Sequence, residues 1–203
     1  SRFDWVSVGR DLTGIGCAHL PGFFHEHECI GLAAVFDQDE CFEHTVACDD
    51  GRGWLTYRFF RPPLPELISL VRNEVYSRLA GIVNHWQALL KRTDRFPSEL
   101  EEFLGKCAQS GQCRSTPIML HYQQGGFNAL HRDVSGKLFF PIQLVVTLGP
   151  SCSQNGGGGE FMLVDEGPGK KSTTNIATGI GDAVLFCTSH RLAKVGGIYG
   201  LQA

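Results

Sequence analysis

Residues 120–133 read LHYQQGGFNALHRD, and the interpretation of the whole chain starts from this stretch. In an extended backbone the side chains alternate between two faces, so His131 and Asp133 share one face and Arg132 points to the other. An imidazole and a carboxylate side by side are two of the three ligands in the 2-His-1-carboxylate arrangement that holds non-haem Fe(II). We therefore take His131 and Asp133 as candidate metal ligands and catalytic residues.

The composition is that of an ordinary globular chain. Its 203 residues suit one domain with a hydrophobic core, and 42% apolar content argues against wholesale disorder. No run approaches the roughly 18 apolar residues of a membrane span, and residues 1–3 do not begin a signal peptide. Eight scattered cysteines without a C-x-x-C pair indicate reduced thiols and a cytoplasmic or nuclear location. The formal charge of −3 gives no broad basic surface for nucleic acid.

Helical periodicity is found in the N-terminal half of the chain. Apolar residues recur at three- and four-residue spacing from Pro65 to Leu90, which predicts the longest helix. A helix is also expected at 28–36, and another at 98–107, where Ser98 and Glu101 form a capping-box pattern. From 116 onward, short β-rich runs between Gly, Pro, Asn and Ser clusters predict strands at 118–120, 138–140, 142–148, 160–164 and 183–186.

Short strands without helices between them are typical of an antiparallel sandwich or jelly roll. We therefore expect an α+β fold in one domain over residues 1–203. Residues 1–115 would be a mainly helical support region packed on a β core formed by residues 116–203.

The order of motifs in the β half resembles a known family. His131-x-Asp133, then Gly158-Gly159-Glu160-Phe161, then Gly181-Asp182-Ala183-x-x-Phe186 is similar to the order in the double-stranded β-helix of Fe(II)/2-oxoglutarate dioxygenases. Matches along the whole chain narrow the resemblance to the Oxygenase-NA family, which is related to AlkB-like and prolyl-hydroxylase-like oxygenases. They include Asp4-Trp5, Gly16-Cys17-Ala18, Pro63-Leu64-Pro65, Asn84-x-Trp86, Asn128-x-Leu130, Phe140-Pro141-x-Gln143 and His190-Arg191.

The resemblance implies a jelly-roll core and the cofactors Fe(II), 2-oxoglutarate and O2. Oxidative decarboxylation of 2-oxoglutarate to succinate and CO2 would accompany hydroxylation of a C–H bond. Hydroxylation of an N-methyl group in damaged or methylated nucleic acid would release formaldehyde, which is demethylation. Tyr122 and Asn128 would contact 2-oxoglutarate or line the site, or else pack as ordinary strand residues. Gln143, a polar residue in an apolar strand, would line the pocket, and Arg132 would contact substrate or form a surface salt bridge.

The sequence does not settle which residue is the third metal ligand. His190 is the only histidine after the Gly181–Phe186 run, and no arginine follows Arg191. In the family that the chain resembles, His190-Arg191 matches an earlier pair, and the ligand sits in a later His-Gly-Val-Ser segment followed by an arginine for 2-oxoglutarate. With the initiator Met also missing, we expect a C-terminally truncated fragment that binds iron poorly and does not turn over alone. His190 would not be a ligand.

Two rival classes of function remain. A protein or prolyl hydroxylase would use the same metal residues, and a non-catalytic jelly-roll binding module would have lost metal binding. Aromatic stacking platforms would favour nucleic acid, whereas a peptide groove along a strand edge would favour protein. If the partner is nucleic acid, the weak positive charge predicts recognition of a flipped or single-stranded base with few phosphate contacts. No membrane partner is expected, and the oligomeric state is open.

Overall fold

The computed structural model describes residues 2–134, 136–149, 159–167, 171–192 and 198–203. The helices are α1 (Trp5–Gly14), α2 (Glu26–Ala33), α3 (Glu66–Leu89) and α4 (Leu100–Gln109), with 3-10 turns η1 (Ala34–Asp37) and η2 (Asp39–Cys41). The strands are β1 (Cys17–Leu20), β2 (Phe42–Asp50), β3 (Gly53–Phe60), β4 (Ile118–His121), β5 (Phe127–Asn128), β6 (Ile142–Val146), β7 (Phe161–Asp165), β8 (Ser172–Ile176), β9 (Ala183–Cys187), β10 (His190–Leu192) and β11 (Ile198–Gln202).

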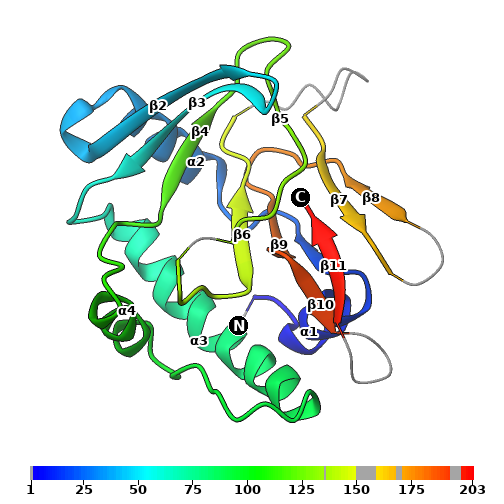
Figure 1. Ribbon diagram of the computed structural model, residues 1–203. Helices are drawn as coiled ribbons and strands as arrows, with labels where there is room; N and C mark the ends of the chain where they lie inside the picture. Colours follow the sequence, from blue (N-terminus) through cyan, green and yellow to red (C-terminus); the bar gives the residue numbers. More distant parts are fainter. Residues whose placement is uncertain (1, 135, 150–158, 168–170, 193–197) are drawn as a thin grey trace.

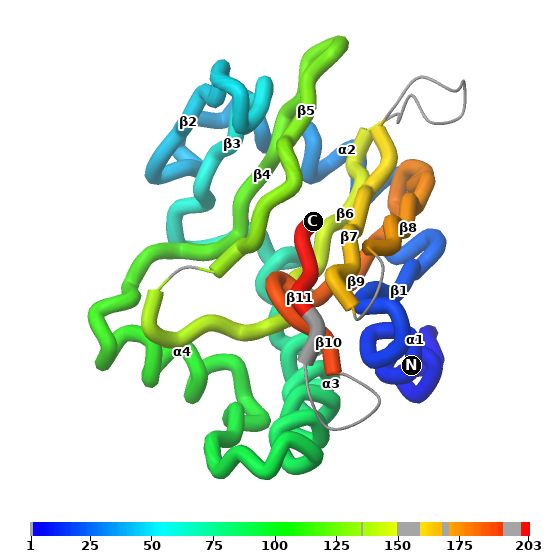
Figure 2. The backbone as a smooth tube through the Cα atoms, turned by 45° about the vertical axis from the view of Figure 1, so that its right-hand side comes forward, coloured from blue at the N-terminus to red at the C-terminus, as the bar shows by residue number. Residues whose placement is uncertain are grey.

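These strands form three sheets, and the paired strands run antiparallel. One sheet has the order β1-β9-β6, the second β10-β11-β7-β8, and the third β2-β3-β4 with β5 also paired to β3. Helices α1, α3 and α4 gather at one end of the molecule, away from the hairpin of β2 and β3 (Figures 1 and 2). The mixture of helices and antiparallel sheets agrees with the predicted α+β class.

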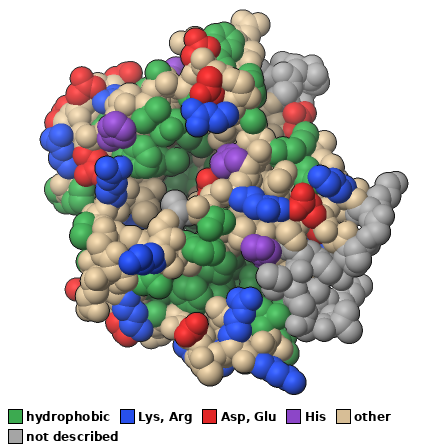
Figure 3. Space-filling view, in the orientation of Figure 1, with side chains coloured by type: hydrophobic (Ala, Val, Ile, Leu, Met, Phe, Trp, Pro, Cys, Tyr) green, Lys and Arg blue, Asp and Glu red, His purple; other side chains and the backbone are tan. Residues whose placement is uncertain are grey.

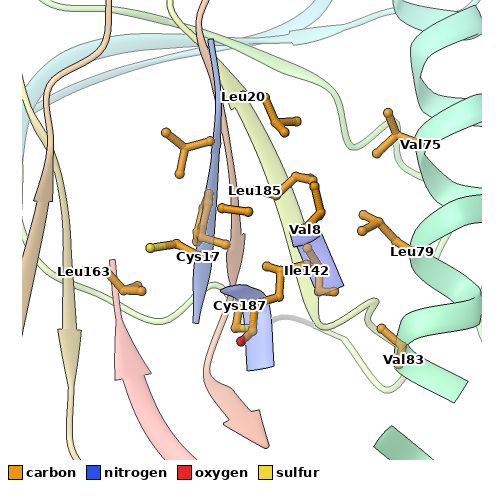
Figure 4. Packing of buried hydrophobic residues seen from close by; sticks show 14 of the residues in the cluster. Val8, Cys17, Leu20, Val75, Leu79, Val83, Ile142, Leu163, Leu185 and Cys187 are labelled. Atoms are coloured by element: carbon orange, nitrogen blue, oxygen red, sulfur yellow. The ribbon is translucent and has the colours of Figure 1, made fainter. Parts of the chain in front are cut away.

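The core is built around β9, whose five residues AVLFC are all buried. A continuous apolar run of this kind is typical of a strand covered on both faces. On one side, Val75, Leu79 and Val83 of α3 point toward the sheet (Figure 4). Leu163 of β7 and Leu201 of β11 belong to the same buried cluster, so the second sheet closes the core.

Gly16, at the start of β1, shows how tightly this core is packed. A Cβ at Gly16 would lie 2.7 Å from a methyl carbon of Leu201, and the backbone has a φ of +85° that favours glycine. The position just before β1 therefore requires glycine, both because there is no room for a Cβ and because the backbone has a positive φ.

The structure confirms the long helix as α3 and the strands at 118–120, 142–148, 160–164 and 183–186 in approximate position. Two local predictions are wrong. Helix α4 begins at Leu100 with Glu99 as its N-cap and no side-chain capping bond, so the Ser98 capping box does not form. Residues 138–140 are not a strand, because the backbone of Lys137 and Leu138 bonds to the side chain of Gln112 instead.

Helix α1 went unpredicted, although its N-cap signal is present in the sequence. Asp4 accepts a bond from the amide of Val6 at 3.1 Å, which is the usual role of an N-cap aspartate. In the described part of the chain, none of the helices combines the length and apolar character that crossing a membrane requires.

Candidate metal centre

The HRD motif follows β5 and is held in place by the last residue of the chain. The amide of His131 donates to the carbonyl of Ala203 at 2.8 Å, and the amide of Ala203 donates to the carbonyl of His131 at 3.0 Å. This pair of bonds has the pattern of a hydrogen-bonded antiparallel pair and keeps the motif beside the end of β11.

His131 and Asp133 lie on the same face of the chain, in contact with each other. Nε2 of His131 is 3.0 Å from Oδ1 of Asp133, and the two side chains are 43% and 41% exposed. Two ligands bound at a right angle about 2.1 Å from one ion lie about 3 Å apart, so this spacing fits adjacent positions around a metal. The donor set of one imidazole and one carboxylate also suits Fe(II).

The other ring nitrogen of His131 has its own partner. Nδ1 is 2.8 Å from the carbonyl oxygen of Ala129. In the neutral ring, a proton on Nδ1 satisfies that carbonyl and leaves the Nε2 lone pair for a metal, which is the usual arrangement for a ligating histidine. The hydrogen bond between Nε2 and Asp133 favours the protonated ring, so metal binding has to displace the Nε2 proton.

The two side chains also shift each other's titration. The hydrogen bond to Asp133 raises the pKa of His131, with partial burial opposing it and the Ala129 carbonyl adding to it. The hydrogen bond with His131 lowers the pKa of Asp133, against the effect of burial, and a hydrogen bond with Gln143 lowers it further. Asp133 is therefore favoured as the carboxylate, the form that binds a cation.

The three residues expected to line the site fall into two groups: Gln143 lies near Asp133, and Tyr122 lies near Asn128. Gln143 is exposed on β6, and its side chain lies close enough to Asp133 to lower the pKa of that carboxyl, so it belongs to the immediate surroundings of the metal pair, His131 and Asp133. The side chains of Tyr122 and Asn128 lie close enough to interact with each other. Burial raises the pKa of Tyr122 and its bond with Asn128 opposes the rise, so the ring is partly desolvated although 42% of the residue is exposed.

Arg132 points away from the metal pair, as alternation requires. Its Nε donates to the carbonyl of Leu201 at 2.9 Å, and its guanidinium forms an ion pair with Glu166. A Cβ at Gly200 would lie 2.8 Å from Oε2 of Glu166 and 3.0 Å from the Arg132 guanidinium, so glycine leaves room for the pair. Of the two roles open for Arg132, the structure has the salt bridge.

Sequence reasoning missed Glu166 and Gly200. The one available signal was a glycine in an otherwise strand-like run, which often marks a close approach of other groups. Nothing near Glu166 in the sequence indicated that it would meet a residue 34 positions earlier.

His190 lies on β10, outside the pair formed by His131 and Asp133. Its Nδ1 is 2.7 Å from Oγ of Ser189. Burial lowers the pKa of His190, and the charges of Arg132 and Arg92 lower it further. Within the described ranges, no group of three or more His, Cys, Asp or Glu residues is placed to hold a metal ion.

The Gly-Gly-Glu-Phe motif is described only in part. Glu160 is exposed just before β7, while residues 156–158 lie outside the described residues.

Comparisons with known proteins show the family and the fold of the chain. A family model called Oxygenase-NA, described as "Oxygenase, catalysing oxidative methylation of damaged DNA", matches residues 55–200, which include His131 and Asp133. The chain belongs to the Oxygenase-NA family. Two uncharacterized proteins of Mycobacterium tuberculosis, from strains CDC 1551 / Oshkosh and H37Rv, are each 37% identical over 134 residues. That match covers 65% of the chain and 57% of each relative, so the Oxygenase-NA chain spans less than two thirds of these relatives.

Two solved structures share the fold at low sequence identity. A prolyl-4-hydroxylase of Pseudomonas putida has a TM-score of 0.57 at 14% identity, covering 98% of this chain and 90% of its own. An oxidoreductase of the 2OG-Fe(II) oxygenase family from Burkholderia pseudomallei has a TM-score of 0.53 at 13% identity, covering 100% and 84%. The Oxygenase-NA chain thus has the fold of 2OG-Fe(II) oxygenases.

Proposed function

We propose that this chain is an Fe(II)/2-oxoglutarate-dependent dioxygenase domain that hydroxylates a C–H bond, with damaged or methylated nucleic acid as substrate. The observation that carries the proposal is the solvent-accessible pair of His131 Nε2 and Asp133 Oδ1, 3.0 Å apart. The family description supports the substrate class, and the two structural neighbours support the cofactor class. We also propose that residues 1–203 form a single domain whose core is a double-stranded β-helix, with the two sheets that share the buried cluster facing each other.

In this proposal each residue has a defined task. His131 and Asp133 hold the metal, the Ala129 carbonyl keeps the imidazole turned with Nε2 outward, and Gln143 orients the Asp133 carboxylate. Tyr122 and Asn128 line the space for the co-substrate. When bound, Fe(II) with 2-oxoglutarate and O2 supplies the oxidising power for hydroxylation. Hydroxylation of an N-methyl group yields an unstable hemiaminal that releases formaldehyde.

The first test is metal binding, measured with Mn(II) as a spectroscopic substitute for Fe(II). We expect His131→Ala and Asp133→Ala each to weaken Mn(II) binding at least tenfold by electron paramagnetic resonance, because each removes a ligand. His27→Ala, an exposed histidine on α2, is the matched control and should bind as the parent chain does. Unchanged affinity in both ligand variants would remove the basis of the proposal.

The second test is turnover by the protein that carries this chain. With Fe(II), 2-oxoglutarate and O2, succinate and formaldehyde should form together on an N-methylated oligonucleotide and not on its unmethylated counterpart. A proline-rich peptide is the competing substrate. Succinate formation on the peptide alone would replace nucleic acid by protein as the substrate class.

A further inference from the structure

Exposed hydrophobic side chains are concentrated around the metal pair. Of the 17 large hydrophobic residues that are well exposed in the described part of the chain, eight fall within residues 118–139, on both sides of the HRD motif. This segment is about a tenth of the chain, so the clustering is not an even scatter. Soluble proteins leave few large apolar patches in water unless something binds there.

Two of these eight residues, Ile118 and Leu120, lie on β4, in the sheet formed by β2, β3 and β4. Phe60 and Met119 lie on one face of the sheet and are buried against the turn η1 and its neighbours. Since side chains alternate along a strand, Tyr57 and Phe59 lie on the opposite face. There Tyr57 pairs with Leu120 and Phe59 with Ile118 across the two strands. We call these four residues the open face.

Aromatic rings contact one another on the open face, with Tyr57 and Phe59 edge to face at an interplanar angle of 71° and Phe59 and His44 tilted at 35°. The ring of Phe59 lies 5.8 Å from that of Tyr57 and 5.8 Å from that of His44 on β2. Figure 3 shows hydrophobic side chains over β3 and β4 that continue to a hollow between β4 and β6. A histidine and an acidic side chain lie at the edge of that hollow (Figure 3).

The charges near the open face offer an anionic partner few free cations. Of the four basic residues between 103 and 159, Arg132 is paired with Glu166 and Lys106 with Glu102. Strand β2, which pairs with β3 beside the open face, carries Glu43, Asp49 and Asp50, and Asp50 is paired with Arg52. Binding at this face therefore has to rest on contacts other than charge.

We propose that the open face binds the unpaired bases of single-stranded nucleic acid by stacking, and leads the strand to the metal pair. The inference rests on the proposed function for the substrate class, and adds the surface, the strandedness and the mode of binding. The half-buried rings of Tyr57 and Phe59 offer stacking surface to unpaired bases, and the more exposed Ile118 and Leu120 cover the apolar remainder. Stacking of this kind tolerates any sequence and requires an unpaired base.

The test is a binding measurement that requires no turnover. A fluorescein-labelled oligothymidylate and a duplex of the same length are titrated with the chain in the presence of a chelator, and anisotropy is read at two salt concentrations. We expect tighter binding to the single strand. Because few phosphates are neutralised, affinity should fall only about tenfold or less between 50 and 200 mM salt.

The variants separate stacking from general apolar contact and from metal chemistry. Phe59→Leu and Tyr57→Leu keep apolar bulk on the strand but remove the ring, and each should weaken single-strand binding about fivefold or more. Leu70→Ala, an exposed residue on α3, is the matched surface control and should not change it. His131→Ala should weaken Mn(II) binding at least tenfold and leave oligonucleotide binding unchanged, so that failure of the proposed function and failure of this inference are told apart.

Three results would overturn the inference. They are equal or tighter binding of the duplex, full affinity in both ring variants, and a salt dependence steep enough to require about eight phosphate contacts. Binding of a proline-rich peptide that is lost in Phe59→Leu, without binding of the oligonucleotide, would assign the open face to a protein partner instead.

Discussion

At the scale of single residues, the orientation of His131 and Asp133 depends on the contacts of Arg132, the residue between them. Arg132 is fixed by the Leu201 carbonyl and by Glu166, and both contacts lie on the side away from His131 and Asp133. Because alternate side chains of an extended segment point in opposite directions, anchoring Arg132 also fixes the direction of its two neighbours. Glu166 thus influences a site that it does not touch.

A conservative change at Glu166 tests this influence. Glu166→Gln should lower Mn(II) affinity about tenfold, in the range seen when residues that support metal ligands are altered. The loss of stability should be small, about 1 kcal/mol or less, because the Arg132 and Glu166 side chains are 38% and 28% exposed. Lys171→Met removes the more exposed partner of Glu166 and serves as control. Equal affinity in all three proteins would show that the anchor is irrelevant to metal binding.

Cys17 provides a pH prediction at the same scale. Burial, with a smaller contribution from the charge of Asp11, raises the pKa of Cys17 from its usual value near 9 to about 11. The unfolded chain therefore loses this proton at lower pH than the folded chain. Stability from Cys17 is complete below pH 9 and is lost as pH rises toward 11, by about 2–3 kcal/mol in total.

Chemical denaturation between pH 8 and 11 measures this loss. Cys17→Ala should be less stable at pH 8, because it leaves a small cavity, but its stability should fall less steeply above pH 9. Cys113→Ala, at an exposed cysteine, should keep the slope of the parent chain. A parallel slope in Cys17→Ala would mean that other groups control the alkaline limit.

At the scale of elements, the loop after the HRD motif is held by one side chain. Oε1 of Gln112 accepts bonds from the amides of Lys137 and Leu138 at 2.9 and 2.8 Å, and its Nε2 donates to the carbonyl of Leu138 at 2.7 Å. A glutamine that makes three bonds to one loop replaces the pairing that a strand would have had. The loop can therefore keep an exposed apolar side chain such as Phe139 in a fixed position.

Gln112→Ala should release this loop. We expect faster hydrogen exchange at the amides of Lys137 and Leu138, because both lose their acceptor, and a loss of stability of about 1–3 kcal/mol. Gln109→Ala, an exposed glutamine on α4, should leave both amides protected. Unchanged exchange in Gln112→Ala would place the restraint on the loop elsewhere.

The same elements show which features the sequence could predict. The α3 helix and the strand β9 were predictable because long periodic or wholly apolar runs leave few alternatives. The 138–140 run has the composition of a strand. The backbone of Leu138, however, bonds to the side chain of Gln112, 26 residues away, and this bond replaces pairing with a strand. No local pattern contains that information.

In the candidate site, too, local features could be predicted from the sequence and contacts between distant residues could not. The shared face of His131 and Asp133 follows from alternation within three residues. The contact from Gln143 to Asp133 and the ion pair from Arg132 to Glu166 join separate strands, and only the fold brings them together. The polar character of Gln143 within an apolar strand was the signal that pointed to it in the sequence, and its role in the site stays a prediction.

At the scale of the whole molecule, one buried cluster joins α1, α3 and both core sheets. Leu185, at the centre of β9, is fully buried within it. Leu185→Ala should cost about 2–5 kcal/mol by loss of apolar contacts and creation of a cavity. Since the elements share one core, calorimetry should show a single transition at a lower temperature. Two separate transitions would indicate that the helices and the sheets unfold independently.

The pairing of β1 with β9 has a consequence for the synthesis of the protein on the ribosome. Leu20 pairs with Ala183, so the first strand meets its partner only after 163 further residues have been made. At 5–20 residues per second that interval lasts roughly 10 to 30 s. Throughout this time Cys17, Ala18 and Leu20, all destined for the interior, have no strand to join. The nascent chain therefore displays an unpaired apolar strand, which is the kind of segment that ribosome-associated chaperones bind.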